Sequence, residues 1–328
     1  MAFLADSGIA DRNHEGTDPA FRADVLDGLS QQQKAVPARW FYDFRGSELF
    51  EQITRLPEYY PTRVETALLR NHGTEMAKLA GPERAVVEFG SGSSIKTPLL
   101  LREMNSSLYV PIDISGDFLR QSSKDLADRF PGLRILPVEA DFMHPVPLPD
   151  ATRNRRMLGF FPGSTIGNLV PSTAVDLLRS IRATLGEGSM LLIGFDRLKA
   201  IERLIAAYDD AQGVTAQFNL NLLHRINREL DADIPVGRFR HSARWNEQWQ
   251  RIEMHLEATE DLGFTVAGHR FAMREGETIH SENSHKYTPG EARLLLHAGG
   301  WTPQAQWTDD GGDFLLVLAE ATARRSAP

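Results

Sequence analysis

A glycine-rich segment follows a short apolar run in the first third of the chain. The run 85–89 leads directly into Gly90-Ser-Gly-Ser-Ser94, and Asp113 ends the next apolar run, 23 residues after Gly90. Glycine lets the backbone turn tightly and approach a ligand without a Cβ atom in the way. An acidic residue at this distance is placed to bond ribose hydroxyls. The spacing therefore predicts a site for a ligand that contains a nucleoside.

The glycine segment departs from two common phosphate-binding patterns. Ile95 stands where G-x-G-x-x-G has its third glycine, and Lys96-Thr97 does not complete G-x-x-x-x-G-K-[ST]. A pyrophosphate fits less well without that glycine, which favours S-adenosylmethionine (SAM). Asp141-Phe142 support this choice, because an acid can pair with the adenine amino group while an aromatic ring covers the base. Lys96 is placed to reach back over the loop and pair with the methionyl carboxylate.

The segment 40–60 is dense in aromatic residues, most of which are expected to form core. Tyr59 and Tyr60 precede a proline, which favours an extended backbone. Their side chains are then expected to point to opposite sides, so that one faces a cavity while the other packs.

Metal ligation is not expected. His280 and Glu282 would share one face of a strand, but His285 would lie on the other. The chain has no cysteine and no helical H-x-x-x-H pair, so neither a thiolate site nor the common zinc motif is available.

Composition limits the classes of protein to consider. The 328 residues are 41% hydrophobic and 24% charged, as in an ordinary globular protein, and the formal net charge is −8. The acidic balance argues against nucleic acid as the main partner. No secretory signal and no apolar run long enough to span a membrane are visible, so we expect a cytoplasmic protein.

Residues 64–198 alternate between helical and strand patterns. The predicted strands are 85–89, 108–113, 133–138, 157–161 and 189–195, and the predicted helices are 64–80, 96–104, 115–129 and 171–185. Apolar strands separated by amphipathic helices are typical of an open parallel sheet with helices on both faces. With right-handed crossovers this gives an α/β fold, a doubly wound Rossmann-like sheet.

The pattern changes after residue 198. Residues 199–231 are predicted to be helical, whereas 238–245, 251–258 and roughly 264–287 alternate with period two, which indicates an antiparallel meander. A helix at 289–298 and a hairpin at 302–320 follow. We therefore expect two domains. One comprises 64–198 with 288–328 and binds the cofactor; a smaller α+β domain, 1–63 with 199–287, binds the substrate.

Several motifs extend the interpretation beyond the fold. WFYDFRGSELFEQITRLPEYYPTR, VEFGSGSSIKT, FFPGSTIGNL, AYDDAQGVTAQFN and ENSHKY occur in this order. Together they make the chain similar to the histidine N-alpha-methyltransferases of ergothioneine biosynthesis, over about residues 20 to 320. The resemblance implies a class I methyltransferase sheet and SAM-dependent trimethylation of histidine to hercynine.

The resemblance also implies roles for individual residues. Those that would hold SAM are Gly90, Lys96, Asp113, Asp141 and Phe142. Those that would line the amino-acid site are Tyr59, Asn168, Tyr208, Glu282 and Ser284. By this resemblance, Asn168 and Tyr208 would hold the substrate carboxylate, and Glu282 and Ser284 would contact the imidazole.

The spacing of Glu282 and Ser284 suits their implied role. Side chains two residues apart on a strand project to one side, so a carboxylate and a hydroxyl could meet one imidazole ring. An apolar ring would leave both buried groups unpaired and be rejected. The intervening Asn283 and the following His285 are then expected to face away from the pocket.

Methyl transfer to an amine needs positioning and a free lone pair more than a strong base. We therefore expect no dedicated catalytic residue, with Tyr59, Asn168 and Tyr208 orienting the substrate, and Tyr42 and Phe50 helping to wall the site. The partner would be a small amino acid, with no nucleic acid or membrane, and a monomer is favoured. One alternative is methylation of another aromatic amino acid such as tryptophan. A second is a nucleic-acid or protein methyltransferase, which the acidic balance opposes.

Overall fold

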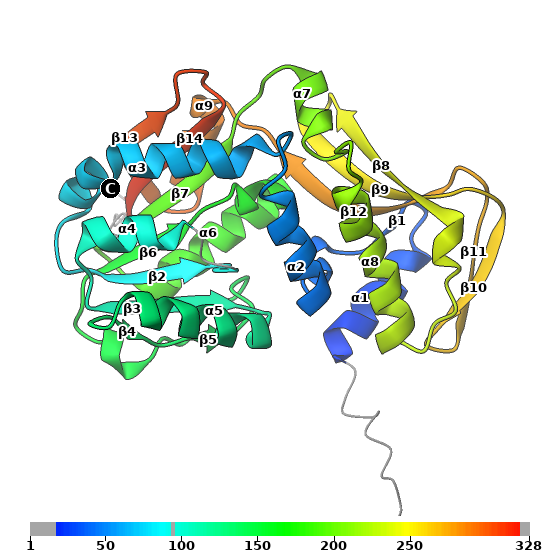
Figure 1. Ribbon diagram of the computed structural model, residues 1–328, viewed down its shortest axis with the longest axis horizontal. Helices are drawn as coiled ribbons and strands as arrows, with labels where there is room; N and C mark the ends of the chain where they lie inside the picture. The colour runs from blue at the N-terminus through cyan, green and yellow to red at the C-terminus, as the bar shows by residue number, and fades with distance from the viewer. Residues whose placement is uncertain (1–17, 93–95, 322–328) are drawn as a thin grey trace, which may run out of the picture.

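Two β-sheets with their helices form two bodies that lie side by side (Figure 1). The structure is a computed structural model that describes residues 18–92 and 96–321. The larger body contains an eight-stranded sheet, and the smaller body contains a four-stranded sheet and a separate hairpin. Helix α2 (Phe44–Ile53) lies between the two bodies in Figure 1.

The larger sheet has the strand order β13-β14-β7-β6-β2-β3-β4, with β5 also paired to β3. Its strands are β2 (Ala85–Phe89), β3 (Leu108–Asp113), β4 (Arg134–Ile135), β5 (Val138–Glu139), β6 (Met157–Phe161), β7 (Met190–Asp196), β13 (Trp301–Thr308) and β14 (Phe314–Ala321). Strands β2 to β7 pair in parallel, and β14 is antiparallel to both β7 and β13. The predicted doubly wound sheet is confirmed.

Both faces of the larger sheet are covered by helices, as its uninterrupted apolar strands require. Val86 and Tyr109 pack on one face with α3 and α4, whereas Val87 and Val110 pack on the other with α6 and α9. The helices of this body are α3 (Tyr60–Ala80), α4 (Thr97–Met104), α5 (Gly116–Arg129), α6 (Pro171–Leu185) and α9 (Pro289–Ala298). Because these strands are parallel, their carboxyl ends lie at the same end of the sheet, and the two cores hold them there.

The smaller sheet has the strand order β1-β12-β9-β8. Its strands are β1 (Lys34–Ala35), β8 (Phe239–Asn246), β9 (Arg251–Ala258) and β12 (Thr278–His285); β10 (Leu262–Val266) and β11 (His269–Met273) form the hairpin. Ile252, Met254 and Leu256 face its core, as their alternation predicts. The same core includes residues of α1 (Pro19–Ser30), α2 and α8 (Val214–Glu229), and the short helix α7 (Ile201–Ala206) packs beside β8. The N-terminal segment and the residues after β7 therefore share one core.

Three predictions about local structure are wrong in part. The strand expected at 133–138 divides into β4 and β5 at Pro137, which has no N–H for a sheet bond. The strand expected over 264–287 divides because Ala267 and Gly268 have positive φ values of 48° and 80° and turn the chain into a hairpin. Tyr60 is not extended: it is the first residue of α3, with Pro61 in the first turn, where proline is tolerated.

The chain passes between the bodies at two neighbouring places after β7. Tyr287 N–H donates to Asp196 O at 2.9 Å, and Arg197 forms an isolated parallel bridge with Tyr287. The segment from 197 to 286 thus leaves and rejoins the larger body at one point. Among the residues that the structure describes, we find no helix with the length and apolarity needed to cross a bilayer.

Candidate functional site

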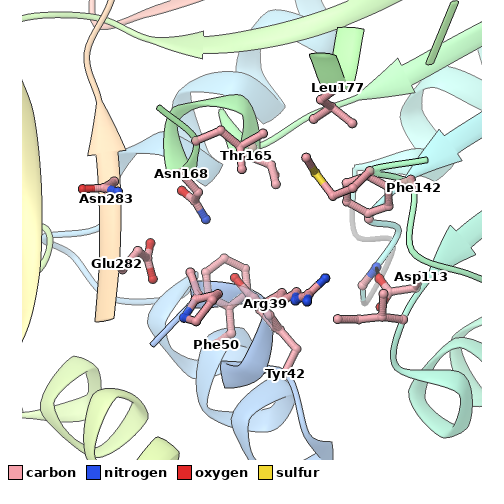
Figure 2. Close-up of a pocket in the computed structure, with 18 of the residues that line it drawn as sticks. Arg39, Tyr42, Phe50, Asp113, Phe142, Thr165, Asn168, Leu177, Glu282 and Asn283 are labelled. Carbon is pink, nitrogen blue, oxygen red and sulfur yellow. Dashed lines mark hydrogen bonds between the residues drawn. The ribbon is translucent and has the colours of Figure 1, made fainter. Parts of the chain in front are cut away.

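A cavity of about 760 Å³ opens between the two bodies. Its walls come from loops at the carboxyl ends of β2, β3, β5 and β6, from the N-terminal segment and from β12. Ligands of open α/β sheets bind at this edge of the strands. Figure 2 shows side chains from both bodies, among them Phe142, Asn168 and Glu282, arranged around one open space.

Strand β2 ends in a tight turn formed by Gly90 and Gly92. Both have positive φ, 69° and 47°, which glycine adopts without strain. The Gly90 N–H donates to Ile112 O at 2.8 Å and holds the turn against β3. A Cβ atom at Gly90 would lie 3.6 Å from the Phe142 ring, so a side chain there would narrow the cavity. Residues 93–95 of the predicted loop lie outside the described part of the chain.

Asp113 occupies the end of β3 beside the glycine turn. Its carboxylate accepts hydrogen bonds from Gly92 N–H at 3.0 Å and Ser115 N–H at 2.9 Å. Burial raises the pKa of Asp113, and these backbone donors oppose the shift. A carboxylate held in this way keeps lone pairs available to a hydroxyl-bearing ligand.

Asp141 and Phe142 face the cavity from the loop after β5. The Phe142 ring is held edge-on by Phe89 and Phe161, at centroid distances of 6.2 and 5.9 Å. Asp141 accepts a hydrogen bond from Met143 N–H at 2.9 Å and another from Arg39 at 2.8 Å. Thus an aromatic face and an anchored carboxylate lie next to the glycine turn.

These residues fit a nucleoside-bearing cofactor such as SAM. The Gly90 turn leaves room for the ligand, and the Asp113 carboxylate can accept hydrogen bonds from hydroxyls. The Phe142 ring can cover a base, and the Asp141 carboxylate can accept from its amino group. All of them, with Gly90 and Lys96, line the same cavity. The predicted cofactor residues are therefore brought together.

Lys96 has a partner that the sequence did not reveal. It immediately precedes α4, and its ammonium forms an ion pair with Glu65 of α3, whose side chain is fully buried. Glu65 also accepts a hydrogen bond of 2.9 Å from Gly163 N–H. Lys96 still lines the cavity, but its charge is already balanced by a protein carboxylate.

An aromatic wall borders the other half of the cavity. Tyr42 and Phe50 contact edge-on at 5.7 Å, and Phe50 contacts Tyr59 at 6.2 Å. Tyr59 faces the cavity, whereas Tyr60 is buried with its hydroxyl 2.8 Å from Asp196. Asn168, at the end of a 3₁₀ turn after β6, lines the cavity opposite this wall (Figure 2).

Glu282 enters the cavity from β12 (Figure 2). Burial raises the pKa of Glu282 to about 8, and the ammonium of Lys286 opposes the shift. Within residues 18–92 and 96–321, no side chain donates a hydrogen bond to its carboxylate. A half-buried acid without a side-chain donor is suited to receive an N–H from a ligand.

Ser284 and Tyr208 lie next to the cavity but do not line it. Their hydroxyl oxygens are 2.6 Å apart, and the Tyr208 ring packs edge-on against Tyr59 at 6.2 Å. The ammonium of Lys286 donates to Ser284 Oγ at 2.7 Å and to Tyr208 Oη at 3.3 Å. Of the five predicted amino-acid site residues, Tyr59, Asn168 and Glu282 line the cavity and these two stand behind it.

The expected orientation of the residues next to Glu282 is correct for His285 only. His285 Nδ1 bonds Gly167 O at 2.8 Å, away from the cavity. Asn283, however, lines the cavity together with Glu282. The register of β12 with β9 shifts between His280 and Glu282 and is regular from Glu282 to His285, so the shift does not account for Asn283.

The metal-type trio considered in the sequence does not come together. His280 Nε2 contacts Glu282 O, and His285 bonds a loop carbonyl. Glu253, His255 and His280 lie closer, with potential ligand atoms within 4.8 Å of one another. Burial lowers the pKa of His255 to about 4, and its ring stacks on the ring of His280 with the centroids 4.7 Å apart. The two histidines thus form a neutral stack beside the Glu253 carboxylate.

Sequence reasoning missed four charged residues that shape the site: Arg39, Glu65, Asp196 and Lys286. Asp196 and Lys286 carried a signal, because the first ends an apolar strand and the second lies inside ENSHKY. Arg39 and Glu65 carried none, since their partners are far away in the sequence.

Comparison with known proteins gives one family for nearly the whole chain. The family described as "Histidine-specific methyltransferase, SAM-dependent" matches residues 21–321. Histidine N-alpha-methyltransferase from Mycolicibacterium smegmatis is 42% identical, over 92% of this chain and 94% of that one. The enzyme of the same name from Mycobacterium tuberculosis is also 42% identical, over 94% and 98%. A 4-dimethylallyltryptophan N-methyltransferase from Aspergillus fumigatus is 26% identical, over 92% and 93%.

Proposed function

The chain belongs to the family of histidine-specific, SAM-dependent methyltransferases, and from this premise we propose that it methylates the α-amine of L-histidine three times to form hercynine. Glu282 carries the proposal for the substrate. It is an acid in the cavity that no described side chain hydrogen-bonds, and its pKa of about 8 keeps it largely protonated in the free protein at neutral pH. The ring N–H of histidine would bond the ionised form, lower this pKa and hold Glu282 as a carboxylate in the complex.

We assign the glycine-turn side of the cavity to SAM. Asp113 would bond the ribose hydroxyls, Asp141 the adenine amino group, and Phe142 would cover the base, with the Gly90 turn close to the nucleoside. Lys96 would reach the methionyl carboxylate while it remains beside Glu65. When bound, SAM supplies a methyl group activated by its sulfonium.

We assign the aromatic side to histidine. Glu282 and Ser284 would bond the imidazole, and Asn168 and Tyr208 would hold the carboxylate. Burial raises the pKa of Tyr42, Tyr59 and Tyr208, so these phenols stay neutral and donate hydrogen bonds. Holding both ends of the amino acid directs its amine towards the cofactor side, and such orientation replaces a dedicated base.

The aromatic wall suits an amine that gains methyl groups. Aromatic faces attract a quaternary ammonium, and Tyr42, Phe50 and Tyr59 surround the space next to the cofactor side. The nitrogen attacks the methyl group through its lone pair, so the ammonium form of the substrate must lose one proton before each transfer. A partly desolvated site lowers the pKa of an ammonium and favours this loss.

The two bodies correspond to two tasks. We propose that residues 64–198 with 288–328 hold SAM and that 1–63 with 199–287 select the substrate. The separate core of the smaller body and the position of the cavity between the bodies support this division. We further propose a monomer that acts on free histidine in the cytoplasm.

The test is substitution of Glu282. Glu282→Ala should reduce the affinity for histidine by about 2–4 kcal/mol, because a charge-assisted hydrogen bond is lost and the ring N–H is left unpaired. Tryptophan should gain relative to histidine, since no buried carboxylate then opposes an apolar ring. The measurement is kcat/KM for histidine and tryptophan, with Glu282→Gln as the matched control that keeps an acceptor oxygen.

Two results would contradict the proposal. If wild-type protein methylates tryptophan better than histidine, the alternative substrate class is correct. If Glu282→Ala retains the wild-type preference for histidine, the ring is recognised elsewhere. Mass spectrometry of the product tests the number of methyl groups, and accumulation of the monomethyl form would limit the reaction to one transfer.

A further inference from the structure

Lys286 is a completely buried lysine at the junction of the two bodies. Its side chain has no exposed surface, and its ammonium lies 2.8 Å from Asp196 at the end of β7. The same ammonium donates to Ser284 and Tyr208, the two hydroxyls behind the cavity. All three of its N–H groups are thereby engaged, one by a carboxylate and two by hydroxyl oxygens.

The ammonium determines what the two hydroxyls can offer to a ligand. Ser284 and Tyr208 have one hydroxyl hydrogen each. One of these two hydrogens lies between the oxygens, which are 2.6 Å apart and hydrogen-bonded to each other. Burial raises the pKa of Tyr208, so its hydrogen is retained. One hydrogen therefore remains for a ligand, and the hydroxyl that offers it has both lone pairs engaged by Lys286 and its neighbour.

We propose that Lys286 is a positioning residue that makes the Ser284–Tyr208 pair a hydrogen-bond donor toward the substrate ring, so that the site takes histidine as neutral imidazole. This inference rests on the proposed function. The Ser284 hydroxyl donates to the unprotonated ring nitrogen, and Glu282 accepts the N–H of the other nitrogen. Tyr208 then gives its hydrogen to Ser284, so in this arrangement the Asn168 amide is the donor to the substrate carboxylate.

The charges around the ring position agree with this assignment. The titratable groups around it and its hydroxyl partners are Glu282, His280, Lys286, Lys199, Asp196, Tyr208, Tyr59 and Tyr42. Asp196 is neutralised within this set, since Lys286 and Lys199 overcome its burial and hold its pKa below the usual range. An imidazolium would direct its second N–H at the hydroxyl that Lys286 holds as a donor, and would lie near the ammonium of Lys286.

Lys199 provides a matched control. Its ammonium also bonds Asp196, at 2.6 Å, and it is almost as buried, with 7% of its side chain exposed. It contacts Tyr60 and Arg197 O but neither hydroxyl of the pair. Lys199→Met and Lys286→Met therefore remove the same kind of ion pair, and only the second frees the hydroxyls.

The first experiment uses wild-type protein with S-adenosylhomocysteine (SAH) and histidine labelled with ¹⁵N in the ring. We expect ¹⁵N NMR of the bound ligand at pH 6 to show one protonated and one unprotonated nitrogen, although much of the free ligand is then imidazolium. Two protonated nitrogens in the bound state would overturn the inference while leaving the proposed function intact. Absence of saturable histidine binding would instead refute the proposed function.

The second experiment compares histidine with its two pyrrolylalanine isomers, each of which keeps one ring N–H and has a C–H in place of the other nitrogen. Relative to histidine, wild type and Lys199→Met should both disfavour the isomer that keeps its N–H toward Glu282 by about tenfold, because this isomer loses only the accepting nitrogen and with it one neutral hydrogen bond. Lys286→Met should reduce this preference to about threefold or less. SAH affinity and melting temperature verify that each variant is folded.

A third ligand, histidinamide, distinguishes the two ends of the substrate. If Lys286→Met changes the preference for histidine over histidinamide and not over the pyrrolylalanines, the hydrogen serves the carboxylate. That result would overturn the assignment to the ring. Equal behaviour of Lys286→Met and Lys199→Met toward all ligands would reduce Lys286 to a structural ion-pair partner.

Discussion

Arg39 donates a hydrogen bond of 2.8 Å to Asp141 and so joins the N-terminal segment to the loop after β5 across the cavity. The same guanidinium bonds Asp24 at 2.7 Å. Arg39 and Asp141 side chains are 36% and 35% exposed, and a pair this exposed contributes little to stability. Its position next to the expected adenine site indicates an effect on ligand entry instead.

Arg39→Ala should therefore change the rates of cofactor binding more than the affinity. The Kd for SAH should change by less than about fivefold, because a half-exposed ion pair is worth about 1 kcal/mol or less. Association and dissociation should both become faster. Stopped-flow fluorescence measures them, with Arg45→Ala as the control. Arg45 lies outside the cavity lining, and among the described residues its ion pair is with Glu48. Unchanged rate constants would show that the pair does not restrict entry.

Asp113→Ala should weaken SAH binding by at least tenfold. A charge-assisted hydrogen bond to the ribose, worth roughly 1.5–3 kcal/mol, is lost, and the anchor of Gly92 N–H is lost with it. Asp113→Asn should have a smaller effect because it keeps one acceptor oxygen. Calorimetry gives the affinities, and Asp117→Ala on the exposed start of α5 is the control. Wild-type affinity in Asp113→Ala would remove the residue from the cofactor site.

Lys96 should have separable roles in stability and in binding. Lys96→Met leaves the Glu65 carboxylate buried without its cation, which should destabilise the protein by about 3–5 kcal/mol. Adding Glu65→Gln removes the unpaired charge and should restore much of the stability. Denaturant unfolding of the single and double variants measures this.

The double variant also tests the cofactor assignment. If Lys96 holds the methionyl carboxylate, the double variant Lys96→Met/Glu65→Gln should still bind SAH weakly although its stability is restored. Recovery of both properties together would mean that Lys96 serves only to neutralise Glu65.

Glu88 should make stability dependent on pH. Its carboxyl is 2% exposed, and burial raises its pKa to about 7 although Thr97 and Tyr109 donate to it. The folded state therefore holds this proton more tightly than the unfolded chain. The resulting stability is fully present below about pH 4.5 and is lost as pH rises through 7, by about 3 kcal/mol at most.

Glu88→Gln should remove this loss. We expect the melting temperature of Glu88→Gln to be close to that of wild type at pH 5 and higher at pH 8.5, with exposed Glu139→Gln as the control. If wild type and Glu88→Gln lose the same stability between these pH values, another group is responsible.

Much of the fold could be predicted because its signals are local. The strands of the larger sheet are apolar runs bounded by turns, and the family resemblance read from motifs such as LPEYYPTR and GSTIGNL is confirmed. The predicted use of SAM agrees with the description of that family. Short interruptions escaped detection, since Pro137 removes one N–H without changing the apolar pattern around it.

The site could be predicted only as far as its motifs extend. Gly90, Asp113 and Glu282 lie in motifs and line one cavity. The partner of Lys96 could not be predicted, because Glu65 reaches Lys96 only through the packing of α3 against the sheet. The position of Ser284 behind the cavity depends on Tyr208 and Lys286, which no spacing rule places there.

The place of β14 in the larger sheet determines the order in which the chain can be assembled during synthesis. β7 and β14 are neighbours in the sheet, yet the whole segment from 197 to 286 is translated between them. Likewise, β1 pairs with β12, more than two hundred residues later. A nascent chain that stops before β14 therefore exposes β7 as an open sheet edge, which is a template for aggregation. Both sheets are complete only when nearly the whole chain has left the ribosome, so C-terminal truncation should be far more damaging than its distance from the cavity implies.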